Sequence, residues 1–216
     1  MYLSCFLLIF SCKRYHYKRT YQKNTWLKQI TLLPFAHVIG DETLSTPFHW
    51  NESERLLTVR WNDTYEKLPG KVIAAFHAIL TLFPEVAYIF KTDDDQQPKP
   101  NRISFFNALA NRLLNQNKRF HYGGQAITIQ AHKSQYHLIH PELPSNLPLE
   151  ATTYCTGRFY FLSKEAIELL DPEKIQQEWF EDYAIGKYMD SGLKQDLLHF
   201  DTTYMLEDAT DFNLHT

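Results

Sequence analysis

Three consecutive carboxylates, Asp93, Asp94 and Asp95, have the type and spacing best suited to chemistry in this sequence. They follow the apolar run 87–90, whose aromatic and β-branched residues predict a buried strand that ends at the acids. Open α/β sheets bind their ligands at this carboxyl edge. Adjacent carboxylates repel one another, and a bound Mg²⁺ or Mn²⁺ with a diphosphate beside it would relieve the repulsion. A solvated acidic turn or a helix cap is the alternative interpretation.

A basic stretch at residues 13–19 follows an apolar run that predicts a first strand within residues 1–10. It contains Lys13, Arg14 and Arg19, with tyrosine and histidine rings between them. Cations at a junction between a strand and a helix can bind phosphates, and an aromatic ring there can stack on a base. The alternative is a solvated basic face.

A second acidic pair, Glu181 and Asp182, opens a predicted helix directly after Trp179 and Phe180. Acids in a first helical turn are favoured by the helix dipole, so plain capping is the alternative to a catalytic role. The preceding segment 130–150 has three prolines, three histidines and little periodicity, which predicts a long loop with a binding function. Its histidines are too irregularly spaced to favour a metal site.

Composition indicates one globular α/β domain over residues 1–216, with 44% hydrophobic residues. The formal net charge of -3 gives no reason to expect a nucleic-acid partner. The three cysteines lack metal-ligand spacing and are too few for a disulfide framework. Residues 1–10 are too short for a membrane span and lack the flanks of a signal peptide, so we expect a cytoplasmic protein without a transmembrane segment.

The predicted elements alternate as β-α-β-β-α-β up to the acids, which favours a mostly parallel sheet with helices on both faces. The predicted early elements are a helix with apolar positions between Trp26 and Leu33, strands at 35–39 and 56–59, and a helix from Pro69 to Pro84. Later elements are a helix at 103–114, strands at 120–127 and 154–162, a helix capped by Ser163, and a strand at 197–200.

Several motifs, taken in order, resemble the β-1,3-glycosyltransferases that include galactosyl-, N-acetylglucosaminyl- and Fringe-type enzymes. The matching segments are 19–26, which ends in Thr-Trp, 63–71, which begins Asp-Thr-Tyr, 91–95, 181–186, which reads Glu-Asp-X-X-X-Gly, and 213–216, which contains His215. The glycine-rich turn of the family is replaced here by Tyr154 to Tyr160, which places large residues near the acceptor side.

The resemblance implies a single GT-A domain, an α/β fold with a mostly parallel central sheet flanked by helices, which binds a nucleotide sugar. It also implies an inverting, metal-dependent transfer of galactose or N-acetylglucosamine from a UDP-sugar to a hydroxyl of a carbohydrate or glycoprotein acceptor, with a β-1,3 linkage. Eukaryotic members of the family act in the Golgi lumen. The implied site residues are Asp182 as catalytic base; Lys13, Arg14, Arg19, Asp63, Lys71, Asp93 and Asp94 for the nucleotide sugar; and Asp95 and His215 for Mn²⁺ or Mg²⁺, with His199 as the alternative to His215.

Two other functions remain open. A catalytically inactive module that binds a nucleotide sugar or a glycan would share the fold without using the base. A nucleotidyl- or phosphotransferase would also use an acidic metal site, but the sequence has neither a Gly-X-X-X-X-Gly-Lys-Ser/Thr loop nor a set of kinase motifs.

Overall fold

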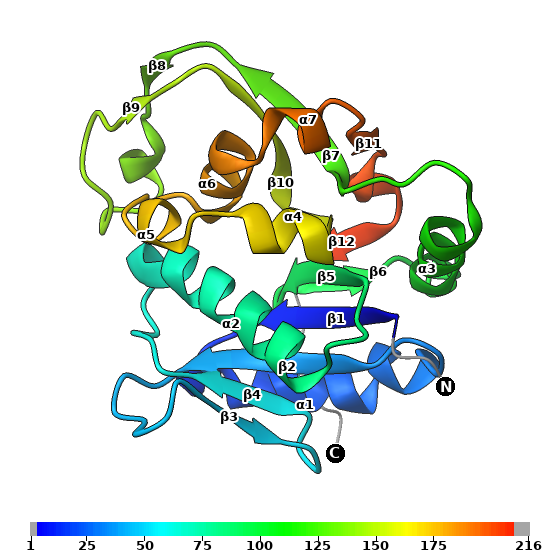
Figure 1. Ribbon diagram of the computed structural model, residues 1–216. Coiled ribbons are helices and arrows are strands. Elements are labelled where there is room, and N and C mark those ends of the chain that lie inside the picture. The colour runs from blue at the N-terminus through cyan, green and yellow to red at the C-terminus, as the bar shows by residue number, and fades with distance from the viewer. Residues whose placement is uncertain (1–3, 210–216) are drawn as a thin grey trace.

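One eight-stranded sheet runs through the protein in the computed structural model, which describes residues 4–209 (Figure 1). In sheet order its strands are β11 (Leu198–His199), β7 (Tyr122–Ile129), β10 (Thr152–Ser163), β5 (Tyr88–Asp93), β1 (Cys5–Phe10), β2 (Phe35–Gly40), β4 (Leu56–Val59) and β3 (Phe48–Asn51). The block β5-β1-β2-β4 is parallel, whereas β3 and β10 run antiparallel to their neighbours. The predicted α/β class with a mostly parallel sheet is confirmed.

β1 lies at the centre of this sheet and is buried along its whole length. Phe6, Leu8 and Phe10 pack into one hydrophobic cluster, and the alternating residues Leu7 and Ile9 pack into another. Side chains of a strand alternate between the two faces of its sheet, so a continuous apolar strand requires cover on both sides.

Helices supply that cover. The described residues form the α-helices α1 (His16–Asn24), α2 (Leu68–Leu82), α3 (Phe105–Asn115), α4 (Lys164–Leu169), α5 (Pro172–Ile175), α6 (Glu181–Tyr188) and α7 (Ser191–Lys194). One cluster contains buried residues of α2, α4, α5 and α6, which lie in front of the sheet in Figure 1. The other cluster contains α3 and a 3-10 turn at Trp26–Gln29, where the Trp26 ring stacks on Phe106 with centroids 5.8 Å apart.

Two short antiparallel pairs lie outside the main sheet. β6 (Gln96–Pro98) follows the acidic triplet directly and pairs with β12 (Leu206–Asp208) near the end of the described chain. β8 (His132–Lys133) pairs with β9 (Pro148–Leu149), so the segment predicted as a loop at 130–150 is tied together at its base. The first of these pairings brings residues near the end of the described chain next to the acids.

The predicted helix between Trp26 and Leu33 is wrong. The helix in this region is α1, which begins inside the basic stretch and ends at Asn24, because the backbone of Thr25 (φ -110°, ψ -104°) leaves the helical region. Trp26 and Ile30 are buried as expected, but they are held by the 3-10 turn and the chain after it. Strand β3 was also missed, whereas Ser163 caps α4 as predicted by accepting from the backbone N–H of Ala166 at 3.1 Å.

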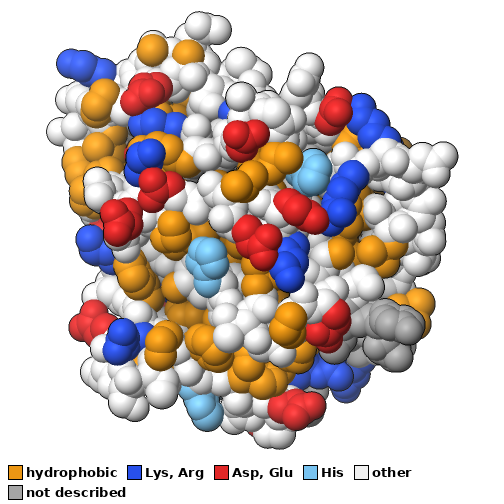
Figure 2. Space-filling model, in the orientation of Figure 1, with side chains coloured by type: hydrophobic (Ala, Val, Ile, Leu, Met, Phe, Trp, Pro, Cys, Tyr) orange, Lys and Arg blue, Asp and Glu red, His pale blue; other side chains and the backbone are white. Residues whose placement is uncertain are grey.

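The surface carries charges of both signs, as expected from the modest formal net charge of -3. Acidic and basic side chains of the described residues are interspersed on the face that Figure 2 shows. Within residues 4–209, no helix combines the length and the apolar character needed to cross a membrane. The three cysteines are free.

Candidate active site

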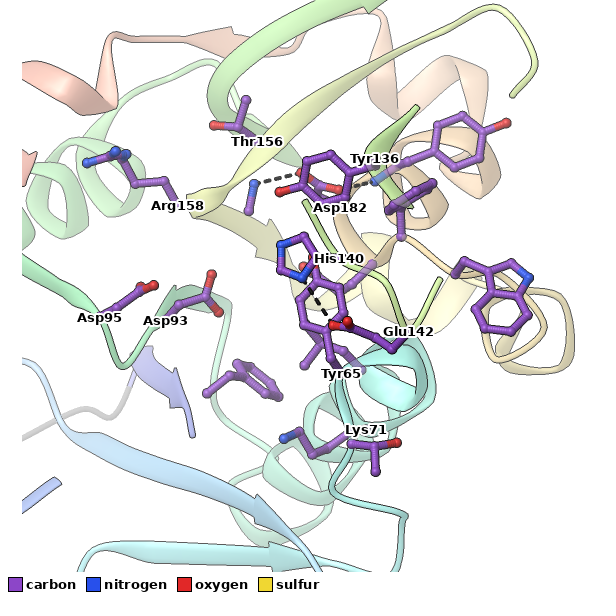
Figure 3. A pocket seen from close by; sticks show the side chains of 18 of the residues that line it. Tyr65, Lys71, Asp93, Asp95, Tyr136, His140, Glu142, Thr156, Arg158 and Asp182 are labelled. Carbon is purple, nitrogen blue, oxygen red and sulfur yellow. Dashed lines mark hydrogen bonds and ion pairs between the residues drawn. The ribbon is translucent and has the colours of Figure 1, made fainter. Parts of the chain in front are cut away.

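A cavity of about 890 Å³ opens at the carboxyl ends of β1 and β5. Its walls also include the middle of β10, the start of α6, the segment 63–71 and part of the loop 130–150 (Figure 3). This is the edge at which the sequence predicted ligand binding, and the volume suits a nucleotide-sized ligand.

The three acids of the triplet point to three different partners. Asp93 forms an ion pair with Lys91 (2.8 Å), and Asp94 forms one with Lys18 on α1 (2.9 Å). Asp95 is exposed, and its Oδ1 accepts a hydrogen bond from the side-chain amide of Gln96 at 3.0 Å. Two of the three charges are therefore compensated by lysines, and only Asp95 offers an exposed carboxylate to a cation in the cavity.

Lys91 is the centre of a buried charge cluster that the sequence did not reveal. Its side chain is 1% exposed, and Nζ contacts Asp93 (2.8 Å), Glu181 (3.1 Å) and the carbonyl oxygen of Gly157 (2.8 Å). Burial opposes the charged form of Lys91, but the two carboxylates outweigh it and raise its pKa above the usual range. Burial raises the pKa of Asp93 to about 7, although Lys91 acts in the opposite direction.

Glu181 belongs to this cluster, whereas its neighbour Asp182 faces the cavity. The hydroxyl of Tyr160 donates to Glu181 Oε1, and burial raises the pKa of Glu181 against the pull of Lys91. The one sequence signal for this network is a lysine within the apolar strand, two residues before the first acid, because a charge buried in such a strand requires a partner.

Asp182 is fixed by two backbone hydrogen bonds. The N–H of Gly157 donates to Oδ2 at 2.9 Å, and the N–H of Tyr183 donates to Oδ1 at 2.8 Å. Burial raises the pKa of Asp182, while Lys91 and these two N–H groups oppose the increase. Each oxygen keeps a lone pair for a further donor, so the carboxylate can accept a proton from a hydroxyl group in the cavity.

The packing of α6 against β10 explains the glycine of the Glu-Asp-X-X-X-Gly motif. A Cβ on Gly186 would lie 2.2 Å from the Cβ of Tyr154, so a larger residue would push α6 away from the strand. The register of β10 against β7 shifts between Cys155 and Tyr160, and within that interval the backbone of Gly157 contacts both Lys91 and Asp182. The close packing of α6 on β10 thus holds Asp182 at the wall of the cavity.

The basic stretch divides into residues that line the cavity and residues that do not. Arg14 lies on the wall with its guanidinium 4.6 Å from the centre of the Tyr15 ring, and Lys18, which we had not predicted, lies beside it. Lys13 instead forms an ion pair with Asp41 (2.8 Å) outside the set of lining residues. Arg19 also lies outside that set, where it donates to the carbonyl oxygen of Cys12 at 2.6 Å and holds the turn after β1.

Asp63 and Lys71 line the cavity and also join neighbouring strand ends. Asp63 Oδ1 accepts from the backbone N–H of Gly40 and from Lys71 Nζ, both at 2.8 Å. Lys71, which is 4% exposed, also donates to the carbonyl oxygen of Ser11 at 2.8 Å. In the described structure these two residues build the floor of the site.

An aromatic stack crosses the cavity mouth and was not predicted residue by residue. His140 stacks between Tyr65 (centroids 4.5 Å apart) and Tyr136 (4.8 Å), and Phe180 meets Tyr136 edge to face. Figure 3 shows His140 directly over Tyr65, with the Glu142 carboxylate hydrogen-bonded to it. We call Tyr65, His140 and Tyr136 the ring stack; it joins the loop 130–150 to the segment 63–71.

The metal ligands predicted around Asp95 are only partly described. His215 lies outside the described residues, and His199 accepts from the backbone N–H of Ala126 at 3.2 Å away from the cavity lining. Residues 4–209 contain no group of three His, Cys, Asp or Glu side chains arranged to hold a metal ion. The exposed carboxylate of Asp95 has the oxygen chemistry that Mg²⁺ and Mn²⁺ prefer.

Comparison with solved structures shows the fold. The chain is similar to a glycosyltransferase involved in glycosylation of the major capsid of PBCV-1, with a TM-score of 0.51, 12% identity, and coverage of 91% of this chain and 81% of that one. It is also similar to a Bacillus anthracis protein described as a glucose-1-phosphate thymidylyltransferase in complex with sucrose, with a TM-score of 0.51, 11% identity, and coverage of 95% and 89%. The first resemblance confirms the predicted GT-A type of fold.

Sequence comparison shows the family. A family model described as Galactosyltransferase matches residues 17–195, which include the basic helix, the acidic triplet and the Glu-Asp-X-X-X-Gly motif. No curated protein matches the chain. The match covers most of the sequence, and the protein therefore belongs to the galactosyltransferase family of glycosyltransferases.

Proposed function

We propose that this glycosyltransferase is inverting and metal-dependent, and that it transfers galactose or N-acetylglucosamine from a UDP-sugar to a glycan hydroxyl, forming a β-1,3 linkage. The observation that carries the proposal is the arrangement of carboxylates in one cavity. Figure 3 shows Asp93 and Asp95 on one side and Asp182 on the other. An inverting transfer needs a base on the face of the sugar opposite the leaving group, and this separation supports that role for Asp182.

The donor would bind between the basic residues of α1 and the acids of β5. Arg14 and Lys18 would contact the diphosphate, since both are cations on the cavity wall. Asp95 would hold Mn²⁺ or Mg²⁺, together with oxygens of the diphosphate and, as proposed from the family motif, His215. When bound, such an ion supplies Lewis-acid stabilisation of the charge on the leaving group.

The acceptor would enter beside the ring stack and Asp182. A hydroxyl within hydrogen-bond reach of Asp182 would pass its proton to that carboxylate as it attacks the anomeric carbon. The raised pKa of Asp182 suits this role, because it makes the carboxylate a stronger base than an exposed aspartate. Aromatic rings at the mouth provide apolar surface for the acceptor sugar and exclude water from the reacting atoms.

The test is transfer from a panel of UDP-sugars, with and without a glycan acceptor, and with Mn²⁺ or EDTA. Asp182→Asn should lower kcat by roughly 10²-fold or more while UDP binding is kept. Both oxygens of Asp182 accept backbone N–H groups, so an amide NH₂ must face one of them, and we expect a loss of stability of about 1–3 kcal/mol. Activity is therefore measured well below the melting temperature of the variant.

Asp171→Asn is the control for replacing an acid at the start of a helix. Asp171 accepts two backbone N–H groups at the start of α5, both on Oδ1, so Asn can keep both bonds, and Asp171 does not line the cavity. This variant should keep full activity. If Asp182→Asn is as active as Asp171→Asn, Asp182 is not the base. A wild-type protein that binds UDP-sugars and never turns them over would identify an inactive binding module.

A further inference from the structure

Lys91 and Asp182 are joined through the backbone of Gly157. Lys91 Nζ donates to the carbonyl oxygen of Gly157 at 2.8 Å, and the N–H of Gly157 donates to Asp182 Oδ2 at 2.9 Å. A Cβ added to this glycine would lie 3.4 Å from Lys91 Nζ and 3.6 Å from Asp182 Oδ2, so both charged groups lie close to the same α-carbon. The backbone segment that holds the acid is thus itself held by the lysine.

A second connection between the two residues runs through α6. Lys91 Nζ contacts Glu181 Oε2 at 3.1 Å, and the hydroxyl of Tyr160 donates to Glu181 Oε1. Glu181 directly precedes Asp182 in the first turn of α6, so a contact that fixes Glu181 also fixes the start of this helix. One ammonium group therefore anchors Asp182 from two sides, through β10 at Gly157 and through α6 at Glu181.

The charge of Lys91 also acts on Asp182. Burial raises the pKa of Asp182, and Lys91 exerts the largest opposing effect. The titratable groups around Asp182 are Lys91 and Asp93 on β5, Glu181 on α6, Tyr154, Cys155 and Tyr160 on β10, Tyr122 on β7, and Tyr65. Burial raises the pKa of these phenols and of the thiol, so they are neutral near pH 7. Among these described groups, Lys91 carries the one positive charge.

We propose that Lys91 is a positioning residue for the reaction, which holds the Asp182 carboxylate at the cavity wall through Gly157 and Glu181. Its positive charge also favours the ionised carboxylate, which is the form that can take a proton from an acceptor hydroxyl. The inference rests on the proposed role of Asp182 as the base. Lys91 itself is 1% exposed and does not line the cavity, so it acts through Asp182 and does not touch the substrate.

Carbon NMR of the full chain, labelled at the aspartate carboxyl carbons, measures the titration of Asp182 without turnover; Asp182→Asn assigns its signal. Lys91→Met should raise the midpoint by about one pH unit or more, because a nearby opposite charge lowers the pKa of a carboxyl group by about 1–3 units. Glu181→Gln should lower the midpoint, since it removes a like charge, and it tests the coupling even if Lys91→Met does not fold. Tyr160→Phe is the matched control: it removes a buried hydrogen bond from the same cluster but no charge, and the midpoint should stay unchanged.

Turnover of a UDP-sugar gives the second readout. In Lys91→Met the acid-side fall of kcat should move to higher pH together with the NMR midpoint, and kcat at pH 8 should drop about tenfold because the base is misplaced. The KM for the donor should stay within about twofold. If neither Lys91→Met nor Glu181→Gln moves the NMR midpoint, Lys91 only stabilises the fold and the proposal is overturned. If the midpoint moves but the pH dependence of kcat does not follow it, the coupling of Lys91 to Asp182 stands, and the base assigned in the proposed function is wrong.

Discussion

Replacing Lys91 by methionine should be among the most destabilising single changes in this protein. The side chain of Lys91 is 1% exposed and that of its partner Glu181 is 4% exposed. Methionine preserves most of the apolar stem and removes the charge, so Glu181 and Asp93 lose their shared counter-ion, and the carbonyl oxygen of Gly157 loses a donor. Removing one partner of a buried ion pair costs roughly 3–5 kcal/mol.

The loss should depend on pH through Glu181. Burial raises its pKa in the folded protein even with Lys91 present, and without Lys91 the pKa should rise further. A folded-state pKa above the unfolded value means that the folded state binds the proton more tightly, so stability falls as pH rises through that interval. The destabilisation by Lys91→Met should therefore be smaller at pH 5 than at pH 8.

Urea unfolding of wild type and Lys91→Met at these two pH values measures both quantities. Lys118→Met is the control, because the Lys118–Asp196 pair is more than half exposed and should contribute less than about 1 kcal/mol. The double variant Lys91→Met/Glu181→Gln should recover part of the stability, since it removes the uncompensated carboxylate. A pH-independent loss below 1 kcal/mol for Lys91→Met would refute the idea that the lysine holds the cluster together.

Three further predictions concern a buried histidine of β2 and two parts of the site. Burial lowers the pKa of His37 to about 3, and Lys23 and Arg19 act in the same direction. Near pH 5 this histidine is therefore protonated only in the unfolded chain, so the free energy of unfolding should fall by about 2 kcal/mol from pH 6.5 to pH 5. Urea unfolding of His37→Gln should show a weaker dependence of stability on pH. Arg14→Ala should weaken UDP binding about tenfold by calorimetry, whereas Lys13→Ala should not change it. His140→Ala removes the middle of the ring stack, at about 1 kcal/mol per ring contact, and should speed limited proteolysis within residues 130–150.

Short-range sequence patterns were enough to predict much of the fold. The apolar run before Asp93 predicted a central strand, and the acids do end it at the ligand-binding edge of a mostly parallel sheet. Asp182 in a first helical turn after two aromatic residues was also recognisable, and it faces the cavity. These features follow from periodicity and from end signals, which act over a few residues.

What could not be predicted depends on contacts between distant segments. The sequence showed three equivalent acids, and only the fold assigns Asp93 to Lys91 and Asp94 to Lys18. The apolar spacing after Trp26 is compatible with a helix or with a buried 3-10 turn, and the backbone of Thr25 decided between them. Likewise, nothing near the acids indicated that β12, more than a hundred residues later, pairs beside them.

The central claim is that this protein inverts the anomeric centre of a UDP-sugar with Asp182 as the base. The most direct measurement is proton NMR of the disaccharide formed from UDP-galactose or UDP-N-acetylglucosamine and a glycan acceptor, with the wild type and Asp182→Asn compared under the same conditions. We predict a β-1,3-linked product that the wild type forms and that Asp182→Asn forms roughly 10²-fold more slowly. An α-linked product, or equal rates for the two proteins, would contradict the mechanism.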